Sequence, residues 1–296
     1  MRKGLFLVLI LTLRGASSAQ TLEEWSENVG WDGVMHWSEY LIFSPKFTGP
    51  NAMPVPEISN GTVNNKSFVR LGGQYQGRSG DQTGNLTFSA GHAFLKDRIA
   101  VDVFMVPIEF YDLSNDRKIE RNVYFEHFDK KTAIGDLYVN TNIQLLNEEN
   151  SWLDLAVRIG LKTASSGLDN PARFIDSPGY YFDVSVGKSF TGERFTFRPY
   201  GMIGFFAWQT NDESLRQNDA VLYGAGLKIG HNGWDFDQSL RGYSGYHNIG
   251  DKPVLLMTSL RREVGGHQLH LNYQYGIRDY LYQGVELSFE YVISRQ

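Results

Sequence analysis

Alternation of apolar and polar side chains is the dominant pattern along this chain. In the segment 135–146 the odd positions from Leu137 to Leu145 are apolar or Thr, and the even positions from Asp136 to Gln144 are polar or Tyr. A period of two places the two sets on opposite faces of a β-strand. The polar set is rich in amides and acids and suits a wet lumen, whereas the aliphatic set suits lipid. This is the pattern of a transmembrane β-barrel strand.

The same alternation recurs along most of the chain and predicts about twelve strands. We expect these strands near residues 66–76, 85–94, 99–110, 135–146, 152–163, 179–188, 194–208, 220–230, 233–243, 254–262, 269–277 and 285–293. The segment 194–208 is aromatic on both faces, so the alternation leaves its orientation open.

The expected connections between the strands alternate in length through most of the chain. Short connections, rich in Gly, Asn or charge, are expected at 95–98, 147–151, 189–193, 231–232 and 263–266. Long ones are expected at 112–133, 164–178, 209–219 and 244–253. Outer-membrane barrels have short periplasmic turns and long external loops, and an even strand number places both termini in the periplasm. A soluble β-sandwich, the alternative fold, needs neither this alternation nor aliphatic outer faces.

Residues 1–19 predict a secretory signal peptide. Arg2 and Lys3 give a positive start, and an apolar core follows over residues 5–13. Residues 17–19 are small, which suits cleavage after Ala19. The apolar core is too short to span a bilayer as a helix, although a membrane anchor is the alternative interpretation. Export combined with repeated amphipathic strands predicts the outer membrane of a Gram-negative cell.

Composition narrows the function classes. Cysteine is absent, which removes disulfides and thiolate chemistry. Aromatic residues make up 14% of the chain, as sheets and interfacial girdles favour. The net charge of −5, with acids and bases mixed, argues against nucleic acid as a partner. The mean hydropathy of −0.33 resembles that of soluble proteins, but barrels share this property because half of each strand faces water or polar side chains.

Residues 20–65 do not follow the alternation and are expected to form a separate segment before the barrel of residues 66–296. Three closely spaced prolines exclude a central strand and favour an extended, rigid path. The segment is either a plug folded into the periplasmic mouth or a periplasmic strap that covers only the rim. The candidate plug residues are Trp31, Trp37, Pro50, Asn51, Pro54 and Pro56.

Three short patterns resemble a known group of barrels. They are Gly135-Asp136 at the start of an alternating strand, the run Gly-Leu-Lys-Thr-Ala-Ser-Ser at 160–166, and Pro-Gly-Tyr-Tyr-Phe-Asp at 178–183. In these the chain resembles outer-membrane barrels grouped with the meta-pathway phenol-degradation proteins, which are similar in turn to long-chain fatty-acid transporters. The resemblance implies an N-terminal hatch and the movement of hydrophobic molecules. The chain departs from the fatty-acid transporters in having fewer expected strands, and no ligand-contacting residue is carried over.

The polar strand faces supply charged candidates for the lumen. They are Arg70, Asp102, Asp136, Asp154, Arg158, Lys162, Asp183, Lys228, Asp235, Asp237, Arg241, Arg261, Arg278, Glu286 and Glu290. One interpretation is a polar permeation path with charged constrictions. The favoured one is that the charges pair across a narrow interior, because charges removed from water need partners.

Two further function classes stay open. Ser244, His247, Asn248 and Asp251 lie together in one expected external loop, as a lipid hydrolase would need. Because loops rarely hold a triad rigidly, no catalytic residue is assigned. No histidine pair has the spacing of a zinc site and no glycine-rich nucleotide motif occurs, so neither metal nor cofactor is expected.

An accessory role is the other class, with a periplasmic or surface protein bound by the N-terminal segment or by the charged, aromatic loop 112–133. The favoured prediction is an all-β, transmembrane antiparallel β-barrel of about twelve strands with an N-terminal plug-like or periplasmic segment. We expect it to be a channel or transporter for small molecules, hydrophobic ones included, with outer-membrane lipid and a small solute as its partners.

Overall fold

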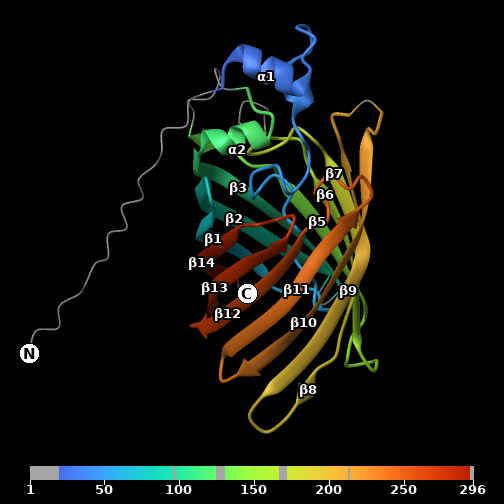
Figure 1. Ribbon diagram of the computed structural model, residues 1–296. Helices are drawn as coiled ribbons and strands as arrows, with labels where there is room; N and C mark the ends of the chain where they lie inside the picture. Colours follow the sequence, from blue (N-terminus) through green and yellow to red (C-terminus); the bar gives the residue numbers. More distant parts are fainter. Residues whose placement is uncertain (1–19, 96–97, 125–130, 167–171, 213, 294–296) are drawn as a thin grey trace, which may run out of the picture.

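The computed structural model describes residues 20–95, 98–124, 131–166, 172–212 and 214–293. The predicted signal peptide, residues 1–19, lies outside the described residues. Within the described part of the chain, twelve long strands form one closed antiparallel barrel (Figure 1). They are β1 Ser67–Arg78, β2 Asp81–Leu95, β3 Ile99–Leu113, β5 Tyr138–Leu146, β6 Asp154–Lys162, β7 Gly179–Gly187, β9 Thr196–Gln209, β10 Gln217–His231, β11 Trp234–Gly245, β12 Val254–Val264, β13 His267–Arg278 and β14 Gln283–Ile293.

Each long strand pairs with the next one along the chain, and the last pairs with the first. The seam between β14 and β1 runs without a break from the pair Ser67–Ile293 to the pair Gly77–Gln283. Closure pairs the backbone N–H and C=O groups of every strand, which a lipid environment requires because it offers no hydrogen bonds. Two-residue strands extend the sheet locally: β4 Thr132–Ala133 pairs with β3, and β8 Phe190–Thr191 pairs with β9.

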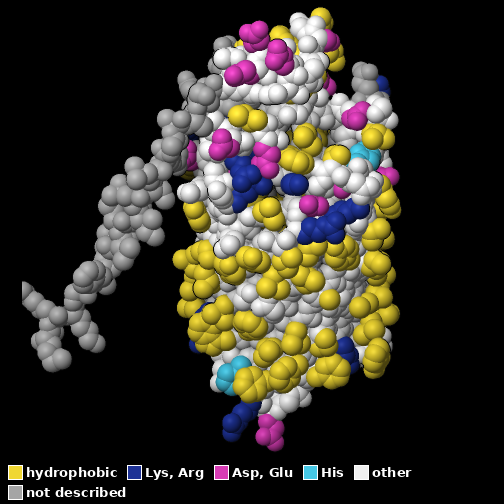
Figure 2. Space-filling model, viewed as in Figure 1, with side chains coloured by type: hydrophobic (Ala, Val, Ile, Leu, Met, Phe, Trp, Pro, Cys, Tyr) yellow, Lys and Arg dark blue, Asp and Glu magenta, His cyan; other side chains and the backbone are white. Residues whose placement is uncertain are grey.

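The outer face of the wall carries the aliphatic half of the alternation. Leu287, for example, is 60% exposed while the next residue, Ser288, is buried. Figure 2 shows a band of hydrophobic side chains across the visible face of the barrel, with charged side chains concentrated above it near the helices and below it at the turns. The fold class expected from the alternation is therefore confirmed.

The two ends of the barrel differ. At one end the connections after β2, β5, β7, β10 and β12 are short, and we call this end the short-turn mouth. At the other end the connections after β3, β6, β9 and β11 are long, and we call it the long-loop mouth. The connection after β3 carries the helix α2, Asn115–Glu120. None of the helices in the described residues is long and apolar enough to cross a membrane.

Three departures from the expected strands bear on the lumen. β1 and β2 each extend toward Gly80, whose φ of +75° allows a tight turn, so this connection at the long-loop mouth is short. β3 contains a bulge around Pro107, where its pairing with β2 skips residues and the alternation changes phase. β5 begins at Tyr138, so Asp136 precedes the strand.

The N-terminal segment begins as a cap over the long-loop mouth. The helix α1, Leu22–Val29, starts with a capping box between Thr21 and Glu24, and the short helix η1, Trp37–Tyr40, follows. In Figure 1, α1 and α2 lie at the same end of the barrel, and the chain then descends inside the wall. The sequence-based expectation placed this segment with the periplasmic turns. The structure instead places α1 and η1 beside the long loops.

Candidate functional site: the lumen and the segment within it

Residues 46–61 run through the barrel from the long-loop mouth to the short-turn mouth, and the wall hydrogen-bonds to their backbone along the way. The backbone oxygens of Thr48, Pro50 and Met53 accept hydrogen bonds from Tyr282 (3.2 Å), Tyr280 (3.2 Å) and Tyr243 (3.4 Å). Further along, the backbone oxygens of Glu57, Asn60 and Gly61 accept from Arg158 (2.7 Å), Arg198 (2.9 Å) and Gln144 (2.7 Å). The wall thus satisfies buried carbonyl groups that an extended, proline-rich path leaves without secondary-structure partners.

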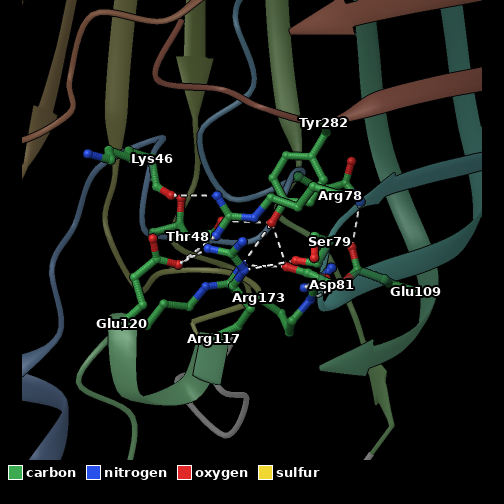
Figure 3. A network of polar contacts seen from close by, with 12 residues as sticks. Lys46, Thr48, Arg78, Ser79, Asp81, Glu109, Arg117, Glu120, Arg173 and Tyr282 are labelled. Atoms are coloured by element: carbon green, nitrogen blue, oxygen red, sulfur yellow. Dashed lines mark hydrogen bonds and ion pairs between the residues drawn. The ribbon is translucent and has the colours of Figure 1, made fainter. Parts of the chain in front are cut away.

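A network of buried charges holds this segment at the long-loop mouth (Figure 3). The Asp81 carboxylate accepts from Arg121, from Arg173 Nη1 at 2.5 Å and from the Tyr282 hydroxyl at 2.5 Å. Glu109 accepts from Arg173 Nε at 2.5 Å and from Asn51 Nδ2 at 2.5 Å. We call this set, with Thr48, the latch.

The latch joins the segment to five other parts of the chain. Asp81 begins β2, Glu109 lies on β3, Tyr282 precedes β14, and the loops after β3 and β6 supply Arg121 and Arg173. Their side chains are fully buried, and two carboxylates face two guanidinium groups, so the charges balance. Removing one member of such a network leaves an uncompensated buried charge, which costs far more than the intact pair contributes.

Arg173 shows the electrostatics of the latch most clearly. Burial alone lowers the pKa of its guanidinium, but Glu109 and Asp81 outweigh burial and hold that pKa above its usual value. Gly49 passes so close to Arg173 that a β-carbon there would lie 2.8 Å from the Arg173 backbone oxygen. Only glycine therefore fits at this point of the segment.

Arg78 ties the neighbouring helix to the same segment. It donates from Nη1 to the Lys46 backbone oxygen at 3.1 Å, and its Nη2 lies 3.3 Å from the Glu120 carboxylate. Glu120 also pairs with Arg117 on α2, and Arg117 donates to the Ser79 backbone oxygen in the β1–β2 turn. The segment, the turn and α2 are therefore fixed relative to one another.

Below the latch, the lumen is filled by apolar packing. Met53 and Val55 are buried in a cluster with Phe206, Trp208 and Tyr243. The ring of Phe206 lies 4.9 Å from that of Trp208 and 5.2 Å from that of Tyr243, measured between centroids. In this half of the barrel the segment and the wall pack as a protein interior does.

The half of the lumen next to the short turns is polar. Three cross-strand ion pairs line it: Arg158 with Asp183 at 2.7 Å, Arg198 with Asp154 at 2.7 Å, and Arg70 with Glu290 at 2.6 Å. A cavity of about 410 Å³ opens at the short-turn mouth, with Arg261, Asp235 and Gln268 among its lining residues.

Glu57 lies in this polar half and differs from its neighbours in the segment. Met53, Val55 and Pro56 are buried, whereas the side chain of Glu57 is exposed although the wall surrounds it. Its carboxylate interacts electrostatically with Arg241, Arg70, Arg261 and Arg158, in that order of strength.

The other charged candidates named from the sequence fall into three groups. Asp136 pairs with Lys162 at 2.6 Å and Lys228 with Asp235 at 2.8 Å. The second group consists of carboxylates that accept hydrogen bonds from amide or hydroxyl groups: Asp102 accepts from Asn140 and Asn142, Asp237 from Tyr200, and Glu286 from Thr87. Arg278 stands apart, because its side chain is 60% exposed at the end of β13 beside Asp279 and is not enclosed by the wall.

The candidate plug residues separate into two places. Trp31 and Trp37 lie in the cap, where Trp31 packs on Trp25 with 5.8 Å between ring centroids and Trp37 is buried. Inside the barrel lie Pro50, Asn51, Pro54 and Pro56. Cap and loops are joined by hydrogen bonds from Trp25 Nε1 to the Asn122 backbone oxygen and from Asn211 to three backbone oxygens of residues 38–41.

Of the latch residues, sequence reasoning named only Asn51, as a plug candidate, and it missed the buried charges. Asp81 precedes the strand expected at 85–94, and Glu109 follows the change of phase at Pro107. Arg121 and Arg173 lie in loops, where side chains do not alternate. Glu57 follows Pro56 in the segment, and no alternation marks its position either. The three prolines were the only signal that pointed to this part of the chain.

The residues proposed for lipid hydrolysis are arranged differently from a triad. Asp251 accepts from Asn218 Nδ2 at 2.8 Å and from the His247 backbone N–H at 3.0 Å. Among the described residues, no hydrogen bond joins Ser244 to His247. A second serine–histidine contact, Ser67 Oγ to His92 Nδ1 at 2.9 Å, lies at the short-turn mouth without a carboxylate to orient the ring in the described part of the chain. No cluster of three or more metal-binding side chains occurs among the described residues.

Comparison with known proteins identifies the fold. No known family model matches the chain, and no curated protein matches its sequence. An outer membrane channel from Pseudomonas putida F1 is similar in structure, with a TM-score of 0.54 and 14% identity, over 81% of this chain and 100% of that chain. The chain is thus a closed, twelve-stranded antiparallel barrel with the fold of outer-membrane channels.

Two further structures are less similar. The NanC porin gives a TM-score of 0.48 and 13% identity over 77% of this chain and 100% of that chain. The transport unit of the autotransporter AIDA-I from Escherichia coli also gives 0.48, with 8% identity over 86% of this chain and 100% of that chain. At these identities the likeness concerns the fold alone.

Proposed function

We propose that the protein is an outer-membrane channel for small molecules in which residues 46–61 act as an internal plug. The observation that carries the proposal is the run of hydrogen bonds from the wall to the backbone of this segment between Thr48 and Gly61. Small barrels can fill their lumen with wall side chains alone. A separate segment that the wall holds largely through hydrogen bonds to its backbone is instead suited to being displaced as a unit.

The apolar cluster supports hydrophobic solutes as cargo. Displacement of Met53 and Val55 leaves Phe206, Trp208 and Tyr243 facing the vacated space, and aromatic walls favour apolar or ring-containing molecules. This agrees with the cargo implied by the resemblance to meta-pathway and fatty-acid transporter barrels.

The arrangement of the loops sets the orientation that we propose. External loops are long and periplasmic turns are short in outer-membrane barrels, so the long-loop mouth faces the outside. The cap of residues 20–45 then lies at the cell surface, and the segment returns through the lumen to start β1 in the periplasm.

The absence of cysteine makes this orientation simple to test. A membrane-impermeant maleimide applied to intact cells is expected to label Asp32→Cys in the exposed cap and to leave Asn150→Cys, in the turn after β5, unlabelled until the cells are lysed. Labelling in the opposite order would reverse the orientation.

Solute permeation into proteoliposomes tests the function itself. The mature chain is expected to admit small solutes slowly, and a variant that lacks residues 20–65 is expected to admit them rapidly. A purely structural barrel, the alternative function, predicts liposomes that stay impermeable with either protein.

A further inference from the structure

The lipid-facing wall carries a shallow apolar groove across the strands β14, β1, β2 and β3. Its floor contains two outward-facing glycines, Gly73 on β1 and Gly84 on β2. In the described part of the chain, a β-carbon at either glycine would meet no atom within 4 Å. Gly73 pairs with Leu86 and Leu287, and Gly84 pairs with Phe110. Large apolar side chains therefore surround two positions without side chains, which leaves a groove of about 480 Å³.

The groove lies in the half of the wall next to the long loops. Gly84 closely follows the β1–β2 turn at Gly80, which belongs to the long-loop mouth. Tyr75 lines the groove and is 52% exposed, and Tyr275 on β13 faces outward at a similar level. Outward-facing tyrosines form the girdle that marks the boundary between acyl chains and headgroups. The groove therefore lies among acyl chains, just below the headgroups on the long-loop side.

Three cations gather at the long-loop mouth above this part of the wall, and we call Lys46, Lys252 and Arg278 the cation cluster. Lys46 crosses the loop after β11, where a β-carbon on Gly250 would lie 2.5 Å from the Lys46 β-carbon. The Asp279 carboxylate joins the other two, because it accepts from the Lys252 backbone N–H at 3.1 Å and lies 3.8 Å from Arg278 Nε. Figure 2 shows Lys and Arg side chains directly above the hydrophobic band.

The side chains of the cation cluster are only partly engaged. The Arg278 side chain stays 60% exposed beside its carboxylate partner. Among the described residues, neither lysine forms an ion pair: Lys252 Nζ donates to the Asn248 side-chain oxygen, and Lys46 Nζ lies 5.2 Å from the centre of the Phe47 ring. Figure 3 shows the amino group of Lys46 directed away from the latch. The cluster is therefore open to an anionic partner.

Acids in neighbouring parts of this mouth are engaged elsewhere. Asp251 is fully buried and accepts from Asn218 Nδ2 at 2.8 Å. Glu120 pairs with Arg78 and Arg117, and the two acids of the latch are balanced by its two arginines. These carboxylates leave the positive charge of the cation cluster in excess.

We propose that the cation cluster and the groove bind the lipid A part of one lipopolysaccharide molecule, with its phosphates on the cluster and an acyl chain in the groove. Lys and Arg bind phosphate through charge-assisted hydrogen bonds. Arg278 ends β13, and the groove begins on the neighbouring strand β14, about 5 Å away. A phosphorylated disaccharide that carries several acyl chains spans both features.

This inference goes beyond the channel function and rests only on the proposed orientation. Lipopolysaccharide occupies the outer leaflet of an outer membrane, and the long-loop mouth faces that side in the proposed orientation. Phospholipids of the inner leaflet would instead surround the half of the wall next to the short-turn mouth.

Lipid A binding to the detergent-solubilised mature chain tests the proposal. Titration followed by native mass spectrometry is expected to show one tightly bound diphosphoryl lipid A per barrel. The same lipid without its phosphates is expected to bind about a hundredfold more weakly, because each cation near an anionic headgroup contributes to the affinity. The triple variant Lys46→Gln, Lys252→Gln and Arg278→Gln is expected to lose this preference by binding diphosphoryl lipid A about a hundredfold more weakly.

A matched triple variant controls for the lost charge. Lys66→Gln, Lys188→Gln and Arg262→Gln remove three cations at the short-turn mouth, and this protein is expected to bind lipid A as the wild type does. Heat-sensitive migration on electrophoresis verifies that each variant retains a folded barrel.

Filling the groove tests its part separately. Gly73→Leu places a side chain in the open space, and we expect it to weaken lipid A binding about tenfold while the preference for phosphates remains. Gly201→Leu is the control, because Gly201 lies on β9, away from the groove, and a β-carbon there meets only an ordinary contact at 3.7 Å. It is expected to bind lipid A as the wild type does.

Four results would overturn the proposal. Equal affinity for lipid A with and without phosphates, or in the wild type and the triple variant of the cation cluster, removes the headgroup site. Equally tight binding of phosphatidylglycerol makes the cluster a general anionic-lipid surface. Loss of a dimer in Gly73→Leu, with lipid A binding unchanged, assigns the groove to a second copy of the chain. Maleimide labelling that reverses the orientation places the cluster at the inner leaflet. Solute permeation does not enter any of these results, so the channel and the lipid site can fail independently.

Discussion

In the half of the lumen next to the long loops, residues 48–55 are enclosed by the latch and by aromatic rings. In the half next to the short turns, residues 57–61 meet the wall through backbone hydrogen bonds, and a solvated cavity opens to the mouth. One segment is thus held by two kinds of environment. We call the half next to the long loops the dry half; it holds the segment in place, because its buried charges and packing are costly to disrupt. We call the half next to the short turns the wet half; its cavity is where a solute can reach the lumen while the segment is in place.

The largest effect is expected from removing a charge from the latch. Arg173→Met leaves Asp81 and Glu109 without a shared partner, which costs about 3–5 kcal/mol for a buried network. Hydrogen exchange measured by mass spectrometry is expected to show this loss as faster exchange in residues 46–53. Arg278→Met removes an exposed arginine near the same mouth and is expected to leave the exchange unchanged. Equal exchange in the two variants would mean that the latch does not hold the segment.

Thiol reactivity compares the two halves directly. If the latch contributes about 3 kcal/mol, the dry half is open in about one molecule in a hundred at any time. A small thiol reagent is therefore expected to react with Met53→Cys about a hundredfold more slowly than with Glu57→Cys. Similar rates at the two positions would show that both halves are equally hydrated, and the comparison would fail.

A smaller change is expected when the segment loses a single hydrogen bond. Asn51→Ala removes one donor from Glu109 but leaves Arg173 in place. Hydrogen bonds to charged groups contribute about 1.5–3 kcal/mol, so the exchange of residues 46–53 should accelerate less than in Arg173→Met. Asn150→Ala, in an exposed turn, is the control. If Asn51→Ala accelerated exchange as much as Arg173→Met does, Asn51 would be the residue that contributes most to holding the segment.

The smallest effect concerns the turn after β5, at the wet end. Burial raises the pKa of Glu148, but the Ser189 backbone N–H, Lys188 and Arg198 together lower it by more, so its pKa is below the usual value. A lowered folded-state pKa stabilises the fold above the unfolded-state pKa, and this contribution is lost as the pH falls through the folded-state pKa. The melting temperature is expected to fall between pH 6 and pH 3 slightly less in Glu148→Gln than in the wild type. An identical fall in both proteins would exclude this contribution.

The alternation of side chains predicted the barrel because lipid and lumen impose opposite chemistry on successive residues. The same alternation accounts for the pair of Arg158 and Asp183, which stand directly opposite each other on β6 and β7. It could not predict the β1–β2 turn, where polar Gln76, Thr83 and Asn85 hydrogen-bond to one another inside the wall. It also could not predict the phase change at Pro107.

The latch and the path of the N-terminal segment were beyond sequence reasoning for a different reason. Arg121 and Arg173 lie in loops, and their partners Asp81 and Glu109 are distant along the chain. Only the closed fold brings these four residues together, and the segment enters the barrel beside them at the long-loop mouth. The prolines indicated an extended path, but nothing local indicates which mouth an extended chain enters or leaves.

Single-channel recording of the mature protein in planar bilayers tests the central claim, that the latch holds a removable plug in the lumen. The account predicts rare, brief openings in the wild type and in Arg278→Met, and frequent, long openings in Arg173→Met. Identical recordings from all three proteins, whether closed or open throughout, would contradict it.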